Sequence, residues 1–317
     1  MNLIKNAICY RITLPATPLL EKHLNELRHA EIQEAEASKL GFTPVEITGA
    51  ETVAHSELVT AFSGGCVFAL RIQEKIIPAA VLKAETKRRC SEWAAERGMI
   101  RAPKDVRQGI QAAVLAEFVR RALVRTTAVT AFYHRSSRFL FVSGTKKQAG
   151  ALVGMLVTAV GAAKTETINV SDVKGGLTTR MQSHIDTGEG FSESFVLESG
   201  VWLARSKERI TAQMEELDEA RKAIAEALEG QFKVEAIRLT HADSGVSFKL
   251  TSDFHLKSIQ GLDADAREAG EGAVETWLQE AAVQTQMMVS VLDDLCTMFD
   301  YKAPEEDPSE KEEEVLA

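Results

Sequence analysis

Few residues of this sequence have the types and spacing that enzyme chemistry requires. The chain lacks a G-x-x-x-x-G-K-[ST] phosphate loop, a G-x-G-x-x-G dinucleotide turn, an H-E-x-x-H zinc motif and a G-x-S-x-G nucleophile turn. Its seven histidines show no metal-ligand spacing, and each is interpreted as a surface or packed residue. We therefore predict a protein that is not an enzyme and needs no metal or cofactor.

The strongest enzymatic alternative is a metal-dependent nuclease built from Asp243, Lys249 and Asp253. Two acids and a basic group in a β-rich region are groups that such a site uses. Acids in turns and a lysine on a strand are common in any protein, so this signal is weak. The basic side chains here, Lys249 and Lys257 together with His255, are equally suited to contact phosphates without chemistry.

A segregation of charge is the clearest pattern in the chain. Residues 83–147 contain fifteen Lys and Arg but only five acids, a local balance of +10, whereas the whole chain has a net charge of −9 and the remaining residues carry −19. A basic surface on an acidic body attracts a polyanion to one place and repels it elsewhere. The pattern favours a local nucleic-acid-binding surface; a solvated, Lys/Arg-rich helical face without a ligand is the alternative.

Aromatic content indicates which kind of nucleic acid fits. Aromatic residues make up only 6% of the chain, and the basic segment offers few of them, such as Trp93 and Phe118. A platform that binds single strands by base stacking uses more aromatic side chains. Contact with the backbone of a duplex is therefore the better interpretation.

Two predicted helices, over residues 81–97 and 105–125, position most of the basic segment. Gly98 is a natural helix stop, and Pro103 stands just ahead of the second helix. The second helix has apolar residues on more than one face and so needs cover on more than one side. A projecting helical hairpin would obtain that cover from a second copy of itself, whereas a helix packed inside its own domain is the alternative.

The remaining elements follow from periodicity and from Gly/Pro signals. We predict a strand over residues 6–14, a turn at Gly41–Pro44, a strand within 66–77 and a hairpin of 129–133 with 139–143. Further along we predict a buried apolar helix near 149–163, a strand at 167–170, a helix over 176–188, strand structure over 195–204, a helix over 209–228, a three-strand meander over 234–259 and a last helix over 274–299.

Bulk composition limits the class and location of the protein. With 317 residues the chain can form two or three domains, and it shows neither a secretory signal nor an apolar run long enough for a membrane span. The four widely separated cysteines form no C-x-x-C pair and are predicted to be reduced, which favours a cytoplasmic location. Residues 303–317 contain seven acids and two prolines and are predicted to be a disordered tail.

Several motifs occur in an order that has a counterpart in a known family. They are Ile4-Lys5-Asn6 followed by Tyr10-Arg11, Glu74–Pro78 followed by Val81-Leu82-Lys83, Arg121–Arg125, Lys146-Lys147, and Gly245–Gly261 with Leu256-Lys257. Together they resemble the recombination-associated protein RdgC family of bacteria, and the resemblance extends to about Phe299. The Glu74–Lys83 match is the most specific of them.

The resemblance implies an α+β fold and a horseshoe-shaped subunit that closes into a ring with a second copy of the chain. Its regions would be a central one (1–80 with 126–172), a helical tip (81–125) and a base (173–302), before the tail at 303–317. The homodimer would encircle double-stranded DNA without sequence preference, associate with the nucleoid and restrain the RecA recombinase. The alternative is a protein-interaction module that docks an acidic recombination partner. No membrane association is expected.

The predicted DNA-binding residues come from two sources. Those that match the family's basic motifs are Lys75, Lys83, Arg121, Arg125, Lys146 and Lys147. Those added on charge alone are Lys87, Arg88, Arg205 and Lys207. The resemblance further implies a dimer contact at Phe118 and Leu123, where Leu123 stands in place of the family's phenylalanine.

Overall fold

The computed structural model describes residues 2–47, 57–161, 165–168, 176–188, 191–212, 217–262 and 272–301. The predicted acidic tail, residues 303–317, lies outside these ranges. Within them the chain is a mixed α/β protein with one large antiparallel sheet and seven helices. The strands are β1 (Ala7–Ile12), β2 (Ser38–Thr43), β3 (Val59–Phe62), β4 (Gly65–Lys75), β5 (Val124–His134), β6 (Phe139–Val142), β7 (Thr165–Thr167), β8 (Phe195–Arg205), β9 (Glu208–Ala212), β10 (Lys233–His241), β11 (Ser247–Thr251) and β12 (His255–Gln260). The helices are α1 (Thr17–Glu26), α2 (Ala79–Glu96), α3 (Lys104–Arg121), α4 (Lys146–Val160), α5 (Leu177–Thr187), α6 (Leu217–Glu229) and α7 (Ala273–Met298).

The sheet joins the two halves of the chain. Its strand order is β2-β4-β5-β6-β1-β12-β11-β10-β8-β9, with β3 paired to β4 and β7 paired to β1. The link between the halves is the β1–β12 pair, in which Ala7 lies opposite Leu256. The predicted meander is confirmed as β10, β11 and β12.

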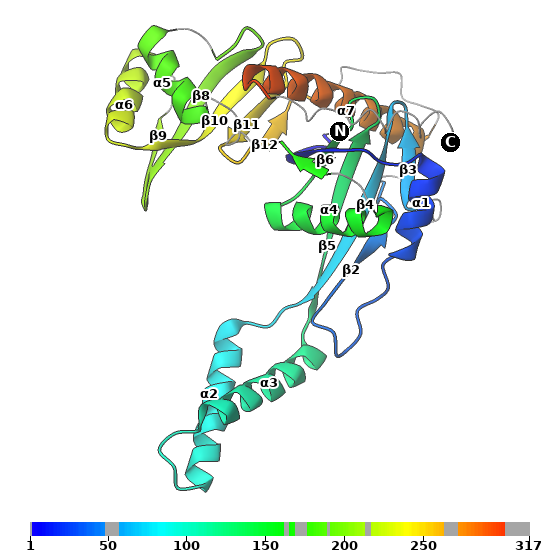
Figure 1. Cartoon of the computed structure of the whole chain (residues 1–317), viewed down its shortest axis with the longest axis vertical. Helices are drawn as coiled ribbons and strands as arrows, with labels where there is room; N and C mark the ends of the chain where they lie inside the picture. The colour runs from blue at the N-terminus through cyan, green and yellow to red at the C-terminus, as the bar shows by residue number, and fades with distance from the viewer. Residues whose placement is uncertain are drawn as a thin grey trace.

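Each face of the sheet has its own hydrophobic core because side chains alternate along the strands. On β4, Val67 and Ala69 belong to one core, whereas Phe68 and Leu70 belong to the other. The first core is covered by α5, α6 and α7, and the second by α1 and α4. Helix α7 buries ten side chains, and its Trp277 stacks on Phe132 with ring centroids 6.3 Å apart. In Figure 1 helix α7 runs along the top of the body.

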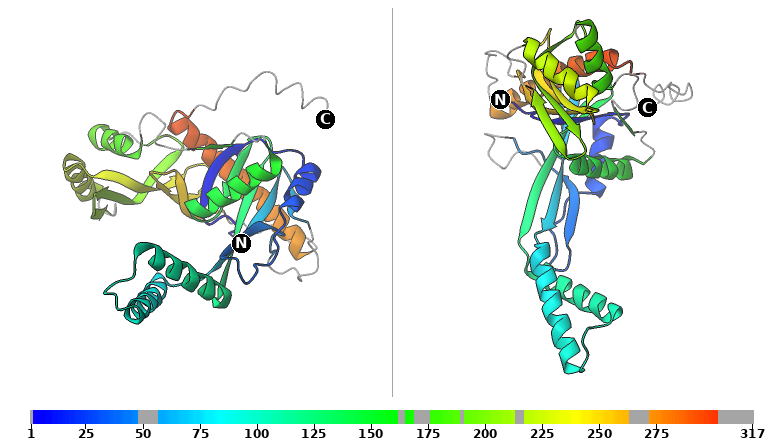
Figure 2. Two further views of the ribbon diagram at one scale, coloured as in Figure 1. Left: turned by 60° about the horizontal axis from the view of Figure 1, so that its bottom comes forward. Right: turned by 90° about the vertical axis from the view of Figure 1, so that its left-hand side faces the viewer.

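A helical hairpin of α2 and α3 projects from this body (Figure 1). It stands at the end of the long β4–β5 ribbon, whose last paired residues are Lys75 and Val124. In the right-hand view of Figure 2 the hairpin lies at the bottom and α6 and β9 lie at the top, whereas in the left-hand view they lie on the same side of the molecule. The chain thus holds two helices of the basic segment away from its own cores.

Three sequence predictions are wrong because pairing between distant strands overrides a local pattern. The predicted helix over 105–125 ends at Arg121, since residues from Val124 onward pair with β4. The start of the predicted helix over 209–228 is instead strand β9, which pairs with β8. Gly41 is not in a turn but in β2, where a Cβ atom would lie 2.4 Å from the Cα of His29. A close backbone approach explains this glycine.

Candidate nucleic-acid interface

The α2–α3 hairpin packs very little of its own surface. Its two helices have 18 residues each, yet they bury only Ala94, Val114 and Val119. The two helices are joined by an ion pair, in which Arg89 Nη2 lies 2.8 Å from Glu117 Oε2. Most of the hairpin's surface is therefore available for contacts outside the chain.

An open groove of about 870 Å³ runs between α2 and α3. Leu82, Ala94 and Ala102 give its wall an apolar part. Its basic lining residues are Lys83, Lys87, Arg101, Lys104 and Arg107. Within the described residues none of these five cations forms an ion pair, and the buried Nε of Arg107 has no hydrogen-bond partner. The groove therefore presents positive charge that the described part of the chain leaves uncompensated.

The predicted site residue Arg88 has a different environment from its neighbours Lys83 and Lys87. Its guanidinium lies 2.6 Å from Glu85 and 2.5 Å from Glu92, both on its own helix. Hydrogen bonds from Arg88 and Arg89 lower the pKa of Glu85 to about 2. This carboxylate stays charged at neutral pH, so Arg88 is largely neutralised before any ligand arrives.

Three predicted residues gather where the hairpin joins the body. Arg125 Nη2 lies 2.7 Å from Glu74 Oε2, and Lys147 Nζ lies 3.8 Å from Glu74 Oε1. The hydrogen bond from Arg125 lowers the pKa of Glu74. Lys75, next to Glu74, donates from Nζ to the carbonyl of Glu34 at 2.6 Å. One carboxylate is thus shared by two cations and leaves a net positive cluster.

Lys146 and Lys147 occupy the first turn of α4. Thr145 caps this helix, with reciprocal hydrogen bonds between Thr145 and Gln148. Cations at a helix N-terminus oppose the helix dipole, whereas an anion there interacts favourably with the dipole and with the lysines. Lys146 also lies 3.7 Å from Asp253, an exposed and therefore weak pair. The arrangement suits a phosphate group.

The predicted residues Arg205 and Lys207 have different environments. Arg205 is used structurally: it lies 2.7 Å from Glu208, donates to the carbonyl of Gly230 and stacks over Phe232. Lys207, in the turn between β8 and β9, is exposed. In Figure 1 the β8–β9 hairpin points from the upper part of the molecule toward the side where the α2–α3 hairpin lies, but the two are separate projections, so a single chain does not gather all predicted residues into one patch.

Sequence analysis named Lys249 and Lys257 as possible phosphate contacts but did not include them among the predicted DNA-binding residues. Lys249 of β11 is opposite Lys257 of β12, and Lys249 Nζ lies 3.3 Å from the ring centre of Trp202. Partial burial, with the charge of Lys257, lowers the pKa of Lys249. The available signal was the alternation of β11, in which buried Phe248 and Leu250 flank Lys249.

The predicted contact residues Phe118 and Leu123 lie in different settings. Phe118 is half-buried on α3, whereas Leu123 is 78% exposed and follows the end of that helix. Leu123 stands at the root of the hairpin, where its carbonyl accepts a hydrogen bond from the backbone of Ile76, which is also exposed. At the other end of the hairpin, Ile100 is fully exposed in the loop between the helices.

The described helices include none that is both long and apolar enough to cross a membrane. In a comparison with known families, a sequence model described as "Putative exonuclease, RdgC" matches residues 3–301. The chain belongs to the RdgC family. The resemblance drawn from its motifs is thereby confirmed. No curated protein matches the chain.

The description of the RdgC family includes the word exonuclease. The positions of the predicted nuclease residues show whether they form one site. Asp243 and Asp253 lie in the turns at opposite ends of β11. The five residues of this strand extend over roughly 16 Å, which is too far for one metal site. Lys249 projects from the middle of β11 toward Trp202. The structure therefore does not assemble Asp243, Lys249 and Asp253.

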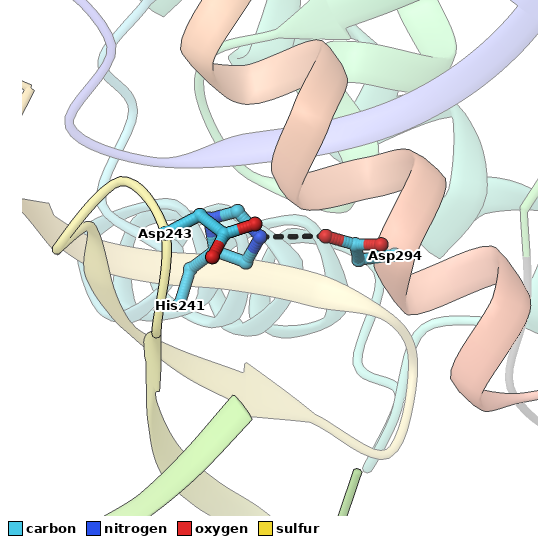
Figure 3. Close-up of side chains that lie close together, drawn as sticks. All are labelled: His241, Asp243 and Asp294. Carbon is cyan, nitrogen blue, oxygen red and sulfur yellow. Dashed lines mark hydrogen bonds and ion pairs between the residues drawn. The ribbon is translucent and has the colours of Figure 1, made fainter. Parts of the chain in front are cut away.

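A different group forms around His241 in this RdgC-family chain. His241, Asp243 and Asp294 place their potential ligand atoms within 4.8 Å of one another (Figure 3). His241 is fully buried; its Nε2 lies 2.7 Å from Asp294 Oδ2 and its Nδ1 lies 2.7 Å from Ser244 Oγ. Asp294 belongs to α7, 53 residues further along the chain. Sequence spacing gave no signal for this group because it depends on how α7 packs.

Proposed function

We propose that this chain is a sequence-independent duplex-DNA-binding protein that encircles DNA as a closed homodimer and restrains RecA-dependent recombination. One observation carries the proposal: five cations without ion-pair partners among the described residues line the groove of a hairpin that buries three side chains. Membership of the RdgC family supports the link to recombination. The proposed protein is not an enzyme.

Binding follows from exchange of counterions on the DNA. Each phosphate met by a Lys or Arg releases a condensed cation, so log K falls against log salt with a slope of about −0.9 per contact. If the five groove cations each meet a phosphate, they contribute a slope of about −4.5. The acidic remainder of the chain repels the polyanion and confines it to the basic surfaces.

Ring closure would use the exposed apolar side chains of the hairpin. Ile76, Leu123 and Ile100 are all at least half-exposed on its two ends. Contact with a second copy would cover them, and a duplex inside the ring could leave only at a free end or when an interface opens. Such a protein occupies duplex DNA without reading it and thereby limits RecA access.

The first experiment measures duplex binding over a salt series for wild type and for Lys83→Glu/Lys87→Glu. Both lysines are exposed and line the groove, so the double variant is expected to bind more weakly and to reduce the salt slope by about 1.8. Lys22→Glu/Lys222→Glu makes the same change of charge on exposed residues of α1 and α6. Equal losses in both variants would show a general charge effect and contradict a groove site.

Encirclement has a separate test. Lifetimes of the complex are compared on a closed circle and on a linear fragment of the same sequence. A longer lifetime on the circle is expected, because a threaded ring cannot slide off it. Equal lifetimes would remove encirclement while leaving DNA binding intact.

Two rival functions have direct tests. A module that docks an acidic protein partner would retain that partner in a pull-down after nuclease treatment. A nuclease would nick supercoiled plasmid or shorten an end-labelled linear duplex in the presence of Mg²⁺ or Mn²⁺. The linear substrate is essential, because the family description names an exonuclease and a closed circle has no ends. We expect both DNA substrates to stay intact.

A further inference from the structure

Two turns of the sheet share one hydrogen-bond arrangement and differ at their second and third residues. The turn after β5 reads His134-Arg135-Ser136-Ser137, and the turn after β10 reads His241-Ala242-Asp243-Ser244. In each turn the histidine Nδ1 contacts the hydroxyl of the serine three residues later, at 2.9 Å and 2.7 Å. Each serine oxygen also accepts a backbone N–H two residues further on, at 3.4 Å. The aspartate at the third position is therefore not needed to build the turn.

Helix α7 passes both turns with adjacent carboxylates. Asp294 lies 2.7 Å from the Nε2 of His241, while the charge of Asp293 acts on His134. Only the second turn adds a carboxylate of its own, because Asp243 stands where the first turn has Ser136. The result is a fully buried imidazole with two carboxylates within 4.8 Å of it and of each other.

No Lys or Arg side chain of the described residues pairs with either carboxylate, Asp243 or Asp294, and His241 is the ion-pair partner of Asp294. Two carboxylates held together at one imidazole concentrate negative charge there. A bound cation would remove it. Asp243 is exposed, so this charge is placed at the edge where an ion can enter.

We propose that His241 Nε2, Asp243 and Asp294 bind a divalent transition-metal ion of the Zn²⁺ type. One imidazole and two carboxylates are a donor set that Zn²⁺ accepts, and three protein ligands leave a fourth position for water or a phosphate oxygen. Ser244 Oγ would accept a hydrogen bond from Nδ1–H and hold the imidazole in the required tautomer. The hydroxyl can serve either tautomer, since it is both donor and acceptor.

Accommodating the ion requires side-chain movements of about 1 Å. Tetrahedral zinc with bonds near 2.1 Å separates two ligand atoms by about 3.4 Å, so the 2.7 Å contact of His241 with Asp294 would open by about 0.7 Å. Ligand atoms that now lie up to 4.8 Å apart would close by as much as about 1.4 Å. The carboxylate of Asp294 is 32% exposed and is free to rotate by that amount. The proposal is independent of DNA binding and is tested without DNA.

The decisive variant is Asp243→Ser, which gives this turn the residue that the β5–β6 turn already carries. Metal is removed from the full chain with a chelator, and Zn²⁺ is titrated by calorimetry. Wild type is expected to bind one equivalent per chain, and Asp243→Ser to bind at least tenfold more weakly with an unchanged melting temperature before metal addition. Asp253→Ser makes the same substitution in the β11–β12 turn and is expected to bind as wild type does.

Two further measurements separate this site from other metal binding. Asp294→Asn keeps an oxygen that accepts the His241 N–H, so its fold is expected to stand while its metal affinity is lost. The absorption spectrum of the Co²⁺ form distinguishes imidazole and carboxylate ligands from the free thiols, of which Cys296 is two residues from Asp294. The proposal is overturned if wild type binds no more tightly than Asp243→Ser, if thiolate bands dominate, or if the site takes Mg²⁺ but not Zn²⁺.

Discussion

The α2–α3 hairpin and helix α7 are both helical, yet they use their side chains in opposite ways. Helix α7 buries ten of its 26 residues against the sheet. The hairpin has 36 helical residues and buries three. Burial of apolar area stabilises a fold, so α7 is part of what holds the body together. The hairpin contributes little to that stability and instead exposes charge and apolar side chains for other molecules.

The largest expected effect is a loss of stability on truncating α7. Leu292→Ala removes a fully buried side chain and is expected to lower the free energy of unfolding by about 2–5 kcal/mol. The same substitution on the hairpin, Leu115→Ala, acts at a side chain that is 40% exposed and is expected to cost less than about 0.5 kcal/mol. Urea unfolding measures both. Equal losses would contradict the division between the two regions.

Removal of the whole hairpin sharpens the comparison. Residues 76–123 are replaced by Asn-Gly, a turn that connects the paired ends Lys75 and Val124. The body is expected to unfold cooperatively near its original temperature, because its cores contain no hairpin residue. Duplex affinity is expected to fall about 100-fold, which corresponds to about 2.7 kcal/mol. An unfolded variant, or one with unchanged DNA affinity, would refute this account.

A smaller effect is expected from one apolar side chain at the root of the hairpin. Leu123→Asp places a charge where the proposed dimer covers an exposed leucine, and it is expected to weaken dimerisation about tenfold or more. Leu19→Asp makes the same change on α1, at a leucine that is 47% exposed on the body. Sedimentation equilibrium compares the two. If Leu19→Asp dissociates the dimer and Leu123→Asp does not, the interface lies on the body.

The smallest expected effect is a pH dependence confined to the body. Burial, with the charge of Lys257 added, lowers the pKa of His255 to about 4. In the unfolded chain His255 takes up a proton near pH 6.5, whereas in the folded chain it does so only near pH 4. Stability is therefore lost as pH falls from about 6.5 to 4. His255→Gln is expected to reduce the drop in melting temperature between those limits.

The hairpin provides the contrast for this measurement. The pKa of Glu85 is lowered to about 2 by its arginine partners, so its charge is constant over the same interval. The melting temperatures of the full chain and of His255→Gln are compared between pH 6.5 and pH 4. Parallel curves for the two proteins would show that His255 does not carry the acid sensitivity.

The sequence determined the features that repeat over a few residues. Local patterns in the sequence predicted three features: the buried stripe on α7, the alternation of Phe248, Lys249 and Leu250, and the concentration of positive charge in residues 83–147. They could be predicted because helix and strand periods extend over only a few residues. The family could also be predicted, since its motifs keep their order along the chain. The division into central, tip and base regions and the closed dimer stay predictions.

Tertiary structure decided everything that depends on register between distant strands. It ended α3 at Arg121 because β5 pairs along the whole of β4, and it brought Arg125 and Lys147 to Glu74. The packing of α7 placed Asp294 against His241 across 53 residues of sequence. Local periodicity carries no information about which strand or helix lies opposite, so contacts of this kind follow only from the folded sheet and its cover.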